Sequence, residues 1–236
     1  MKKLKLSLPL IGLFCAAPLF QSCLDDDDNP HYYEPTALVT VCPNEDGSFV
    51  MNLDNETILR PTNISTSPFK NKKVRALVNF SEVEGVNAHR LEKNVIVHWI
   101  DSIRTKNPVF AVENNDMAYG KDPIEIVRDW VTVAEDGYLT LRVRTAWGHS
   151  GTPHSINLVS GVNPDDPFEM ELRHNANGDN HGQLGDALIA FDISSLPGFD
   201  DNVRIILRWE SFSGEKKTEF FFKPIWTDDN DDEASR

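Results

Sequence analysis

The sequence predicts an all-β protein with two domains, a small barrel followed by an antiparallel β-sandwich. Short runs rich in β-branched and aromatic residues recur between turn-forming clusters of Gly, Pro, Asn and Asp. The first series of runs shows no 3.6-residue helical period. A polar, turn-forming stretch at 113–123 separates this series from a second one, and 236 residues are enough for two small domains.

The first 22 residues predict a bacterial lipoprotein signal peptide. Three Lys residues precede an uncharged apolar run at 6–20, which is too short to span a bilayer. Ser22 then precedes Cys23, as in signals that are cleaved before a cysteine whose thiol carries a diacylglyceryl group. Because several acyl chains on one residue anchor a protein stably, we expect Cys23 to hold the mature chain in the outer membrane. An ordinary secretory signal with a chance cysteine is the alternative, since Phe20 stands where lipoprotein signals usually have Leu.

Four consecutive acidic residues, Asp25, Asp26, Asp27 and Asp28, follow this cysteine closely. They resemble the acidic signal that directs some lipoproteins to the outer face of the outer membrane, so we expect a surface-exposed protein. Their alternative role is to keep residues 23–35 extended as a solvated tether by self-repulsion. The two roles are compatible.

The whole chain is strongly acidic, with a formal net charge of −14. The signal segment carries three Lys and no acidic residue, so its removal leaves a net charge of −17. This charge argues against nucleic acid as a partner.

Cys15 leaves with the signal and Cys23 is acylated, so Cys42 is the only free thiol and is interpreted as a small buried hydrophobe in a strand. The acidic tail at 227–236 is expected to be disordered.

The first domain, 36–112, is expected to consist of short strands joined by polar turns. The strand at 94–103 has apolar residues on both faces, which predicts a central position in the sheet. His89 and His98 are single histidines, which we interpret as surface and core residues and not as ligands. The expected strands are 36–42, 48–53, 73–80 and 94–103.

The second domain, 124–226, is expected to be the sandwich. The run 138–147 alternates cleanly, which places Leu139, Leu141 and Val143 on one inner face. A series of short strands separated by turn signals over about 100 residues is typical of a two-sheet sandwich. The expected strands are 124–133, 138–147, 154–160, 168–174, 186–193, 203–212 and 217–223.

Residues 163–182 contain the densest group of functional side chains. Two metal-binding hypotheses use them: a site with His174, Asp179 and His181, or a calcium loop with Asn175, Asn177 and Asp179. The spacing fits neither a zinc site nor an EF-hand, which needs acids at its first positions and Glu at its twelfth. We therefore interpret the segment as a strand that runs into an Asn- and Gly-rich hairpin loop, and we expect no metal and no cofactor.

Catalytic motifs are weak in this sequence. The His-Ser dipeptides at 149–150 and 154–155 lack the strand, turn and helix that a G-x-S-x-G nucleophile requires. The sequence contains no Walker loop, no G-x-G-x-x-G and no H-E-x-x-H. We therefore predict that the protein is not an enzyme.

Several stretches together resemble the NigD-like lipoproteins. Besides the cysteine with its acidic run, they are Arg75–Phe80, Asp122–Trp130, Asp136–Leu139, Asn163–Pro167, Glu171–Asp179, Ala190–Asp192 and Leu207–Trp209. The resemblance implies an N-terminal OB-type barrel and a C-terminal β-sandwich over most of the mature chain. It also implies a bacteriocin immunity role, which was proposed for one member from its operon. No catalytic or ligand-binding residues come with the resemblance.

Two functions from different classes follow. The first is a non-enzymatic surface lipoprotein that binds another macromolecule, such as a basic bacteriocin, which an acidic protein attracts at long range. The alternative is a carbohydrate-binding accessory lipoprotein, because OB folds and sandwiches commonly host glycan sites. Three Trp side chains are candidates for a glycan platform, although packing in the core is the preferred interpretation of each: Trp130, Trp147 and Trp226.

Overall fold

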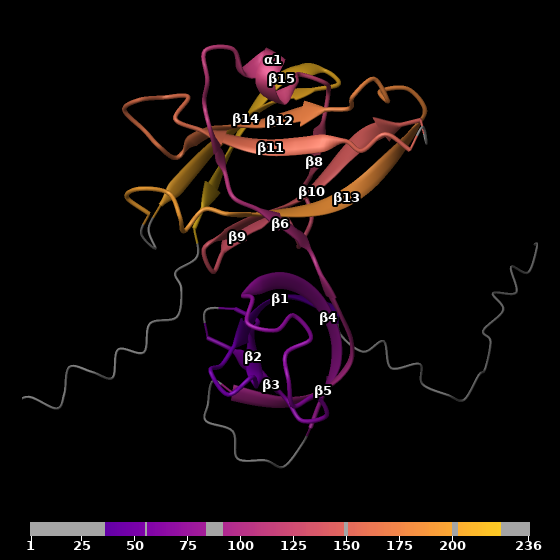
Figure 1. Ribbon diagram of the computed structural model, residues 1–236, viewed down its shortest axis with the longest axis vertical. Helices are drawn as coiled ribbons and strands as arrows, with labels where there is room; N and C mark the ends of the chain where they lie inside the picture. The colour runs from indigo at the N-terminus through magenta and orange to yellow at the C-terminus, as the bar shows by residue number, and fades with distance from the viewer. Residues whose placement is uncertain (1–35, 55, 84–91, 149–150, 200–202, 223–236) are drawn as a thin grey trace, which may run out of the picture. The chain divides into compact units, whose positions relative to one another are not determined.

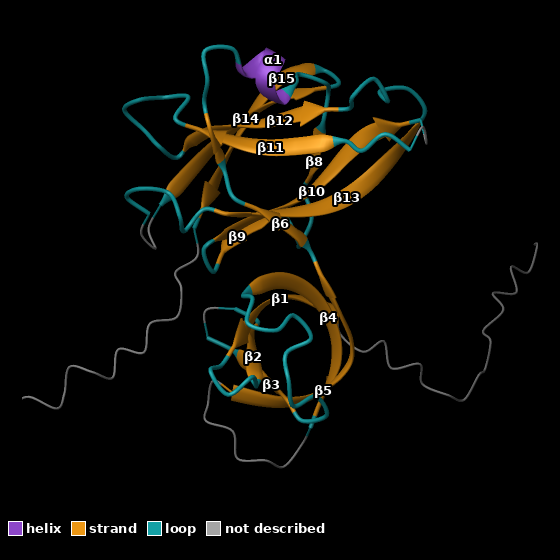
Figure 2. Cartoon of the chain, viewed as in Figure 1, coloured by secondary structure: helices purple, strands orange, loops and turns teal. Residues whose placement is uncertain are grey.

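The computed structural model describes residues 36–54, 56–83, 92–148, 151–199 and 203–222 (Figure 1). They belong to one compact unit, Glu34–Arg236. The described chain consists of strands and one short helix, which confirms the all-β prediction (Figure 2). No helix within it is long and apolar enough to cross a membrane. The predictions for the signal peptide, Cys23, Asp25–Asp28, the tether, His89 and the acidic tail lie outside the described residues.

The first domain is a closed five-stranded barrel with the order β1-β2-β3-β5-β4. Neighbouring strands are antiparallel except β3 and β5, which are parallel. Alternate residues of the strands point inward and form a compact apolar core that includes Val39, Met51, Val78 and Val95. The barrel strands are β1 (Thr36–Pro43), β2 (Phe49–Asn52), β3 (Ile58–Pro61), β4 (Val74–Glu82) and β5 (Glu92–Ser102).

Strand β5 lies between β3 and β4, so the predicted central position is confirmed, but the expectation of two buried faces was wrong. Val95 and Val97 point into the core, whereas Ile96 and Trp99 are 41% and 45% exposed. The register with β4 skips His98, because Val97 lies opposite Phe80 and Trp99 lies opposite Asn79. One extra residue in a bulge reverses the alternation of the strand, which turns Trp99 outward.

The second domain is a sandwich of two five-stranded sheets, which we call sheet B and sheet C (Figure 2). In sheet B the order is β6-β13-β10-β8, with β9 also paired to β10, and in sheet C it is β15-β14-β12-β11-β7. Sheet B contains β6 (Arg104–Lys106), β8 (Glu125–Val127), β9 (Val133–Glu135), β10 (Tyr138–Trp147) and β13 (Gln183–Asp192). Sheet C contains β7 (Val109–Phe110), β11 (Ser155–Ser160), β12 (Glu169–Asn175), β14 (Arg204–Ser211) and β15 (Gly214–Phe221).

The chain enters the sandwich earlier than the sequence indicated. Strands β6 and β7 pair with β13 and β11, so the first sandwich strand begins at Arg104, ahead of the linker expected at 113–123. That linker instead contains the helix α1 (Asn115–Tyr119), whose first turn is capped by the side chain of Asn114. Strands of two or three residues owe their position to distant partners, so local sequence does not reveal them.

The strand expected at 124–133 is two short strands, β8 and β9, separated by a turn. The Thr132 hydroxyl donates to the carbonyl of Val127 at 2.7 Å and accepts from the amide of Arg142 at 3.2 Å. This local hydrogen bonding closes the turn and ends the strand.

The sandwich core lies between the two sheets, and its inner face agrees with the sequence pattern. Leu139, Leu141 and Val143 of β10 are buried against residues of β12 and β14 such as Met170 and Leu207. The hairpin turn before β10 places Asp136 and Gly137 at φ values of 52° and 83°, as the Asp-Gly pair predicts.

One buried arginine joins a barrel strand to the sandwich. Arg75 of β4 has no exposed surface, and its guanidinium donates to Thr40 Oγ1 at 2.7 Å and to Glu135 Oε1 at 2.6 Å. It also donates to Thr140 Oγ1 at 3.4 Å. Cys42, interpreted as a small buried hydrophobe in a strand, lies in β1 and is half-buried, and this burial raises the pKa of its thiol.

Candidate functional site

The segment 163–182 is a loop, the strand β12 and a tight turn. Asn163 Oδ1 accepts from the amide of Asp165 at 3.0 Å, and Asp166 Oδ1 accepts from the amide of Phe168 at 2.9 Å. These contacts are the local side-chain hydrogen bonds that the sequence predicted. They keep the loop in position ahead of β12.

The turn after β12 uses the same chemistry. Asn175 Oδ1 accepts from the amide of Asn177 at 2.8 Å, and Asn177 Nδ2 donates to the carbonyl of Pro153 at 2.7 Å. Asn177 and Gly178 have φ values of 51° and 86°, which Asn and Gly adopt with little strain. The two Asn side chains proposed as calcium ligands therefore hold the turn.

Behind this turn lies a series of polar side chains, of which His174 and Asp179 are buried and His154 is partly buried. His174 is 2% exposed, and its Nδ1 donates to the carbonyl of Pro123 at 3.1 Å. Its Nε2 lies 3.0 Å from His154 Nδ1. The other nitrogen of His154 lies 3.7 Å from Asp179 Oδ2, and Asp179 Oδ1 accepts from the amide of Gly148 at 2.8 Å.

The hydrogen bonds assign protons along this series. Because the Pro123 carbonyl can only accept, His174 carries its proton on Nδ1, and its Nε2 accepts from His154 Nδ1. Burial lowers the pKa of His174, since desolvation disfavours the imidazolium, and the hydrogen bond to Pro123 opposes this effect. His174 is therefore neutral at neutral pH.

The structure brings together only part of the proposed transition-metal set. His174 and Asp179 are linked through His154, which the sequence hypothesis did not include. Within the described ranges, no group of three or more His, Cys, Asp and Glu side chains is arranged to hold a metal ion. The residues of the first His-Ser dipeptide lie outside those ranges, and His154 of the second contacts His174.

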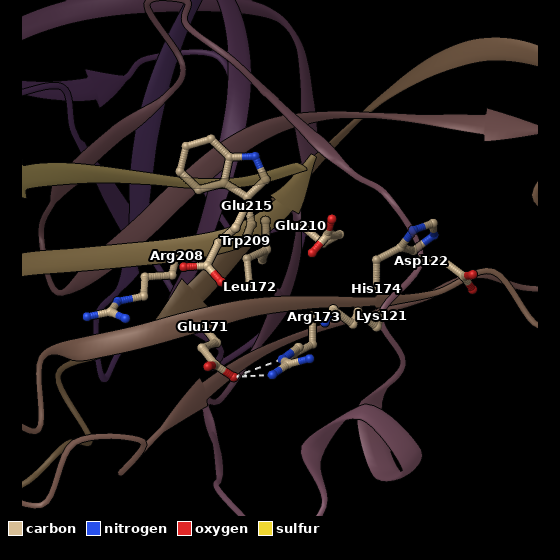
Figure 3. A pocket seen from close by; sticks show the side chains of 10 residues that line it. All are labelled: Lys121, Asp122, Glu171, Leu172, Arg173, His174, Arg208, Trp209, Glu210 and Glu215. Atoms are coloured by element: carbon tan, nitrogen blue, oxygen red, sulfur yellow. Dashed lines mark hydrogen bonds and ion pairs between the residues drawn. The ribbon is translucent and has the colours of Figure 1, made fainter. Parts of the chain in front are cut away.

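A charged crevice lies on sheet C, between β12, the β14–β15 hairpin and the segment that contains Lys121 and Asp122 (Figure 3). Its volume is about 60 Å³, the space of roughly two water molecules. It can therefore admit the head group of one side chain but not a typical small-molecule ligand.

Most cations of the crevice are already paired. Arg173 donates to Glu171 Oε2 at 2.6 and 2.8 Å, drawn as dashed lines in Figure 3, and also pairs with Asp116 of α1. Arg208 pairs with Glu169, whose pKa is lowered by a hydrogen bond from Asn163 and by this ion pair.

Two further carboxylates of the crevice lie on the β14–β15 hairpin. Glu210 and Glu215 lie directly opposite each other on β14 and β15. Within the described part of the chain, neither forms an ion pair with a basic side chain. Like charges directly opposite on neighbouring strands destabilise a sheet. This pair therefore forms a negative site that a basic group from outside would stabilise.

Two of the three Trp side chains that were expected to pack in the core are instead exposed. Trp130 is 59% exposed in the turn between β8 and β9, and Trp147 is 48% exposed at the end of β10. The expectation of core packing was wrong for both, because one lies in a turn and the other at a strand end. Trp226 lies outside the described residues.

Comparisons with protein families match both domains. The NigD-like N-terminal OB domain matches residues 38–103, and the NigD-like C-terminal β-sandwich domain matches residues 107–222. No curated protein matches the chain.

Several solved structures share the fold. One, described as a candidate toxin-related protein from Parabacteroides distasonis, is 30% identical with a TM-score of 0.63, covering 80% of this chain and 93% of the other. A NigD-like immunity protein from Bacteroides caccae is 20% identical with a TM-score of 0.55, covering 81% and 99%. A candidate lipoprotein from Bacteroides fragilis is 15% identical with a TM-score of 0.59, again covering 81% and 99%.

Proposed function

We propose that this chain, which belongs to the NigD-like family, is a non-enzymatic surface lipoprotein that binds a basic protein and confers immunity to a bacteriocin. The family and the similarity to a structure described as an immunity protein support the immunity role. The acidic composition supports a basic partner, because opposite charge speeds encounter and selects the partner.

The observation that carries the proposal is the carboxylate pair in the crevice on sheet C. Glu210 and Glu215 lie opposite each other, and a Lys or Arg side chain of the partner would relieve their repulsion. The volume of about 60 Å³ suits one such head group. The neighbouring arginines, Arg173 and Arg208, are paired with other carboxylates and leave this pair available.

The location follows from the N-terminus. Cys23 would carry the acyl chains that anchor the protein in the outer membrane, and Asp25–Asp28 would direct it to the outer face. The similarity to a candidate lipoprotein supports this location. Immunity at the surface requires the protein to meet the toxin before the toxin reaches its target.

Deletion of the gene, followed by challenge with cationic bacteriocins from related bacteria, tests the proposal. Loss of the gene is expected to increase sensitivity to at least one of them, and the wild-type gene should restore resistance. Cys23→Ser should fail to restore resistance and should leave the membrane fraction. Equal sensitivity of the deletion strain across the panel would contradict the immunity role.

The crevice is tested in the same strain. The double variant Glu210→Gln/Glu215→Gln should restore resistance poorly although the protein is present at the wild-type level. The control Glu45→Gln removes a carboxylate from the exposed turn between β1 and β2 and should restore resistance fully. Full protection by the double variant would exclude the crevice as the binding site.

A glycan-binding function is the second candidate, and the exposure of Trp130 and Trp147 favours it. Exposed indole rings stack on sugar faces through their apolar surface. A glycan array with the chain from residue 24 discriminates the two functions. Binding that Trp130→Ala or Trp147→Ala abolishes would favour the carbohydrate function over immunity.

A further inference from the structure

The space between the two sheets opens into a cavity at one end of the β10–β13 hairpin. The cavity has a volume of about 330 Å³ and is bounded by β10, β13 and β6 of sheet B and by the start of β11 in sheet C. This volume lies at the lower end of the range for small-molecule sites. The cavity is separate from the crevice on sheet C, because the two share no lining residue.

The sizes of the inner side chains explain the cavity. Opposite residues on β10 and β13 become smaller toward the open end, in the order Leu139–Phe191, Leu141–Ile189, Val143–Ala187 and Thr145–Gly185. The first two pairs belong to the packed core, and the last two line the cavity. The small residues at this end of β10 and β13 leave space that side chains of sheet C do not fill. The cavity is therefore a result of these residue sizes.

Most walls of the cavity are apolar. Val143, Ala187 and Ile189 line it from sheet B, and Ile156 lines it from β11. Trp147 lies near its end, with its ring 6.2 Å from the ring of His154. Apolar walls with a few polar groups at one side are characteristic of ligand sites.

Two cations line the edge of the cavity at β6. Arg104 lies opposite Ile189 and Lys106 lies opposite Phe191, which are both inner positions of β13. Lys106 Nζ reaches across to sheet C, where it donates to the carbonyl of Ile156 and to Asn157 Oδ1, both at 2.6 Å. Lys106 therefore projects into the space between the sheets, and the exposed Arg104 lines the cavity beside it.

Neither cation has an acidic partner among the residues that the structure describes. The only carboxylate of the lining, Asp186, is engaged by Arg142 and Arg144 on the other face of β10. Burial and the nearby Arg104 lower the pKa of Lys106. In a chain of net charge −14, two neighbouring cations without an acidic partner give a locally positive region that favours an anion.

We propose that this cavity binds an amphipathic carboxylate, with its alkyl chain against Val143, Ala187 and Ile189 and its carboxylate at Arg104 and Lys106. A carboxylate accepts the paired N–H groups of Arg104 and the remaining donor of Lys106. The alkyl chain leaves water for the apolar walls. This site does not depend on the immunity function.

Calorimetric titration with straight-chain carboxylates tests the proposal. The protein is the chain from residue 24, which contains the whole compact unit Glu34–Arg236. From butanoate to octanoate, each methylene should tighten the Kd about three- to fourfold, and the gain should stop once the chain fills the cavity. Octanol and octylamine have the same number of carbons as octanoate but no carboxylate, and they should bind more than tenfold more weakly.

Substitutions test whether these ligands bind in the cavity. Arg104→Gln should weaken octanoate about tenfold and leave octanol unchanged, whereas the exposed control Arg128→Gln should change neither. Ala187→Trp should block both ligands by filling the cavity. If that variant does not fold, Ala187→Leu should still shorten the longest chain that binds. Absence of octanoate binding, equal binding of octanoate and octanol, or binding unaffected by both Ala187 variants would overturn the proposal.

Discussion

The barrel and the sandwich contain their cores in different ways. In the barrel every strand is hydrogen-bonded on both sides, and the inner residues fill the enclosed space. In the sandwich each sheet ends in edge strands, and the inner layer becomes thinner toward one end of the β10–β13 hairpin. The charged crevice, the buried histidines and the cavity all belong to the sandwich.

This difference has a physical cause. A closed barrel has no free edge, so its inner positions can be filled uniformly by apolar side chains. Two packed sheets leave open ends and edges, where small residues and unpaired charges are tolerated. The crevice and the cavity, which are the candidate binding sites, therefore lie in the domain whose sheets are not closed.

The largest expected effect concerns the contact between the two domains. Arg75→Met removes the cation of a buried ion pair together with the hydrogen bonds that Arg75 donates to Glu135 and Thr40. Unfolding in urea should show a loss of about 3 kcal/mol or more. Arg60→Met, which breaks an exposed pair with Glu92, should cost less than about 1 kcal/mol. Equal losses for the two variants would show that Arg75 does not stabilise the domain contact.

The same substitution in the two cores compares their packing directly. Ala76 is fully buried in the barrel, whereas Ala187 lines the cavity of the sandwich. Ala76→Leu should destabilise the protein by about 1–3 kcal/mol, because a filled core cannot take extra methylenes. Ala187→Leu should be neutral or stabilising, since it fills empty space. Thermal unfolding of both variants measures the difference, and equal destabilisation would mean that the sandwich end is packed like the barrel.

The buried His174 of the sandwich predicts that the free energy of unfolding depends on pH. Because the folded-state pKa of His174 lies below its unfolded value of about 6.5, its contribution is fully present above that pH. The contribution is lost as the pH falls through the folded-state pKa. The stability advantage of the wild type over His174→Gln should therefore shrink between pH 7.5 and pH 5. A stability difference that stays constant over this pH range for His174→Gln would contradict the assignment.

The smallest expected effect concerns the carboxylate pair of the crevice. Glu210→Gln should raise the free energy of unfolding by about 0.2–1 kcal/mol, because it removes a repulsion between opposite residues on β14 and β15. The gain should decrease at high salt, which screens exposed charges. A loss of stability at low salt would show that Glu210 has a stabilising partner.

Much of the fold could be predicted from local patterns. Alternation in 138–147 identified the inner face of β10, and the Asp136-Gly137 pair, a common hairpin sequence, forms the turn before it. The bulge at His98 could not be predicted, because it depends on the register between β4 and β5. Strands β6 and β7 could not be predicted for a similar reason, because the strands with which they pair lie far along the chain.

The site was less predictable than the fold. The sequence drew attention to His174 and Asp179, but their connection runs through His154, which lies twenty residues before His174 in another strand-end region. The opposition of Glu210 and Glu215 had a usable signal, because the two-residue hairpin turn at Phe212 and Ser213, followed by Gly214, fixes which residues face each other. The cavity depends on side-chain sizes across two paired strands and becomes visible only when their register is known.

The most direct test of the proposed function is the affinity of the chain from residue 24 for a bacteriocin against which the gene protects. The Kd should weaken strongly between 50 and 500 mM salt, since attraction between exposed charges is screened. The double variant Glu210→Gln/Glu215→Gln should bind at least tenfold more weakly at low salt, and Glu45→Gln should bind like the wild type. An affinity that is unchanged by both salt and the double variant would contradict a role for the acidic crevice in immunity.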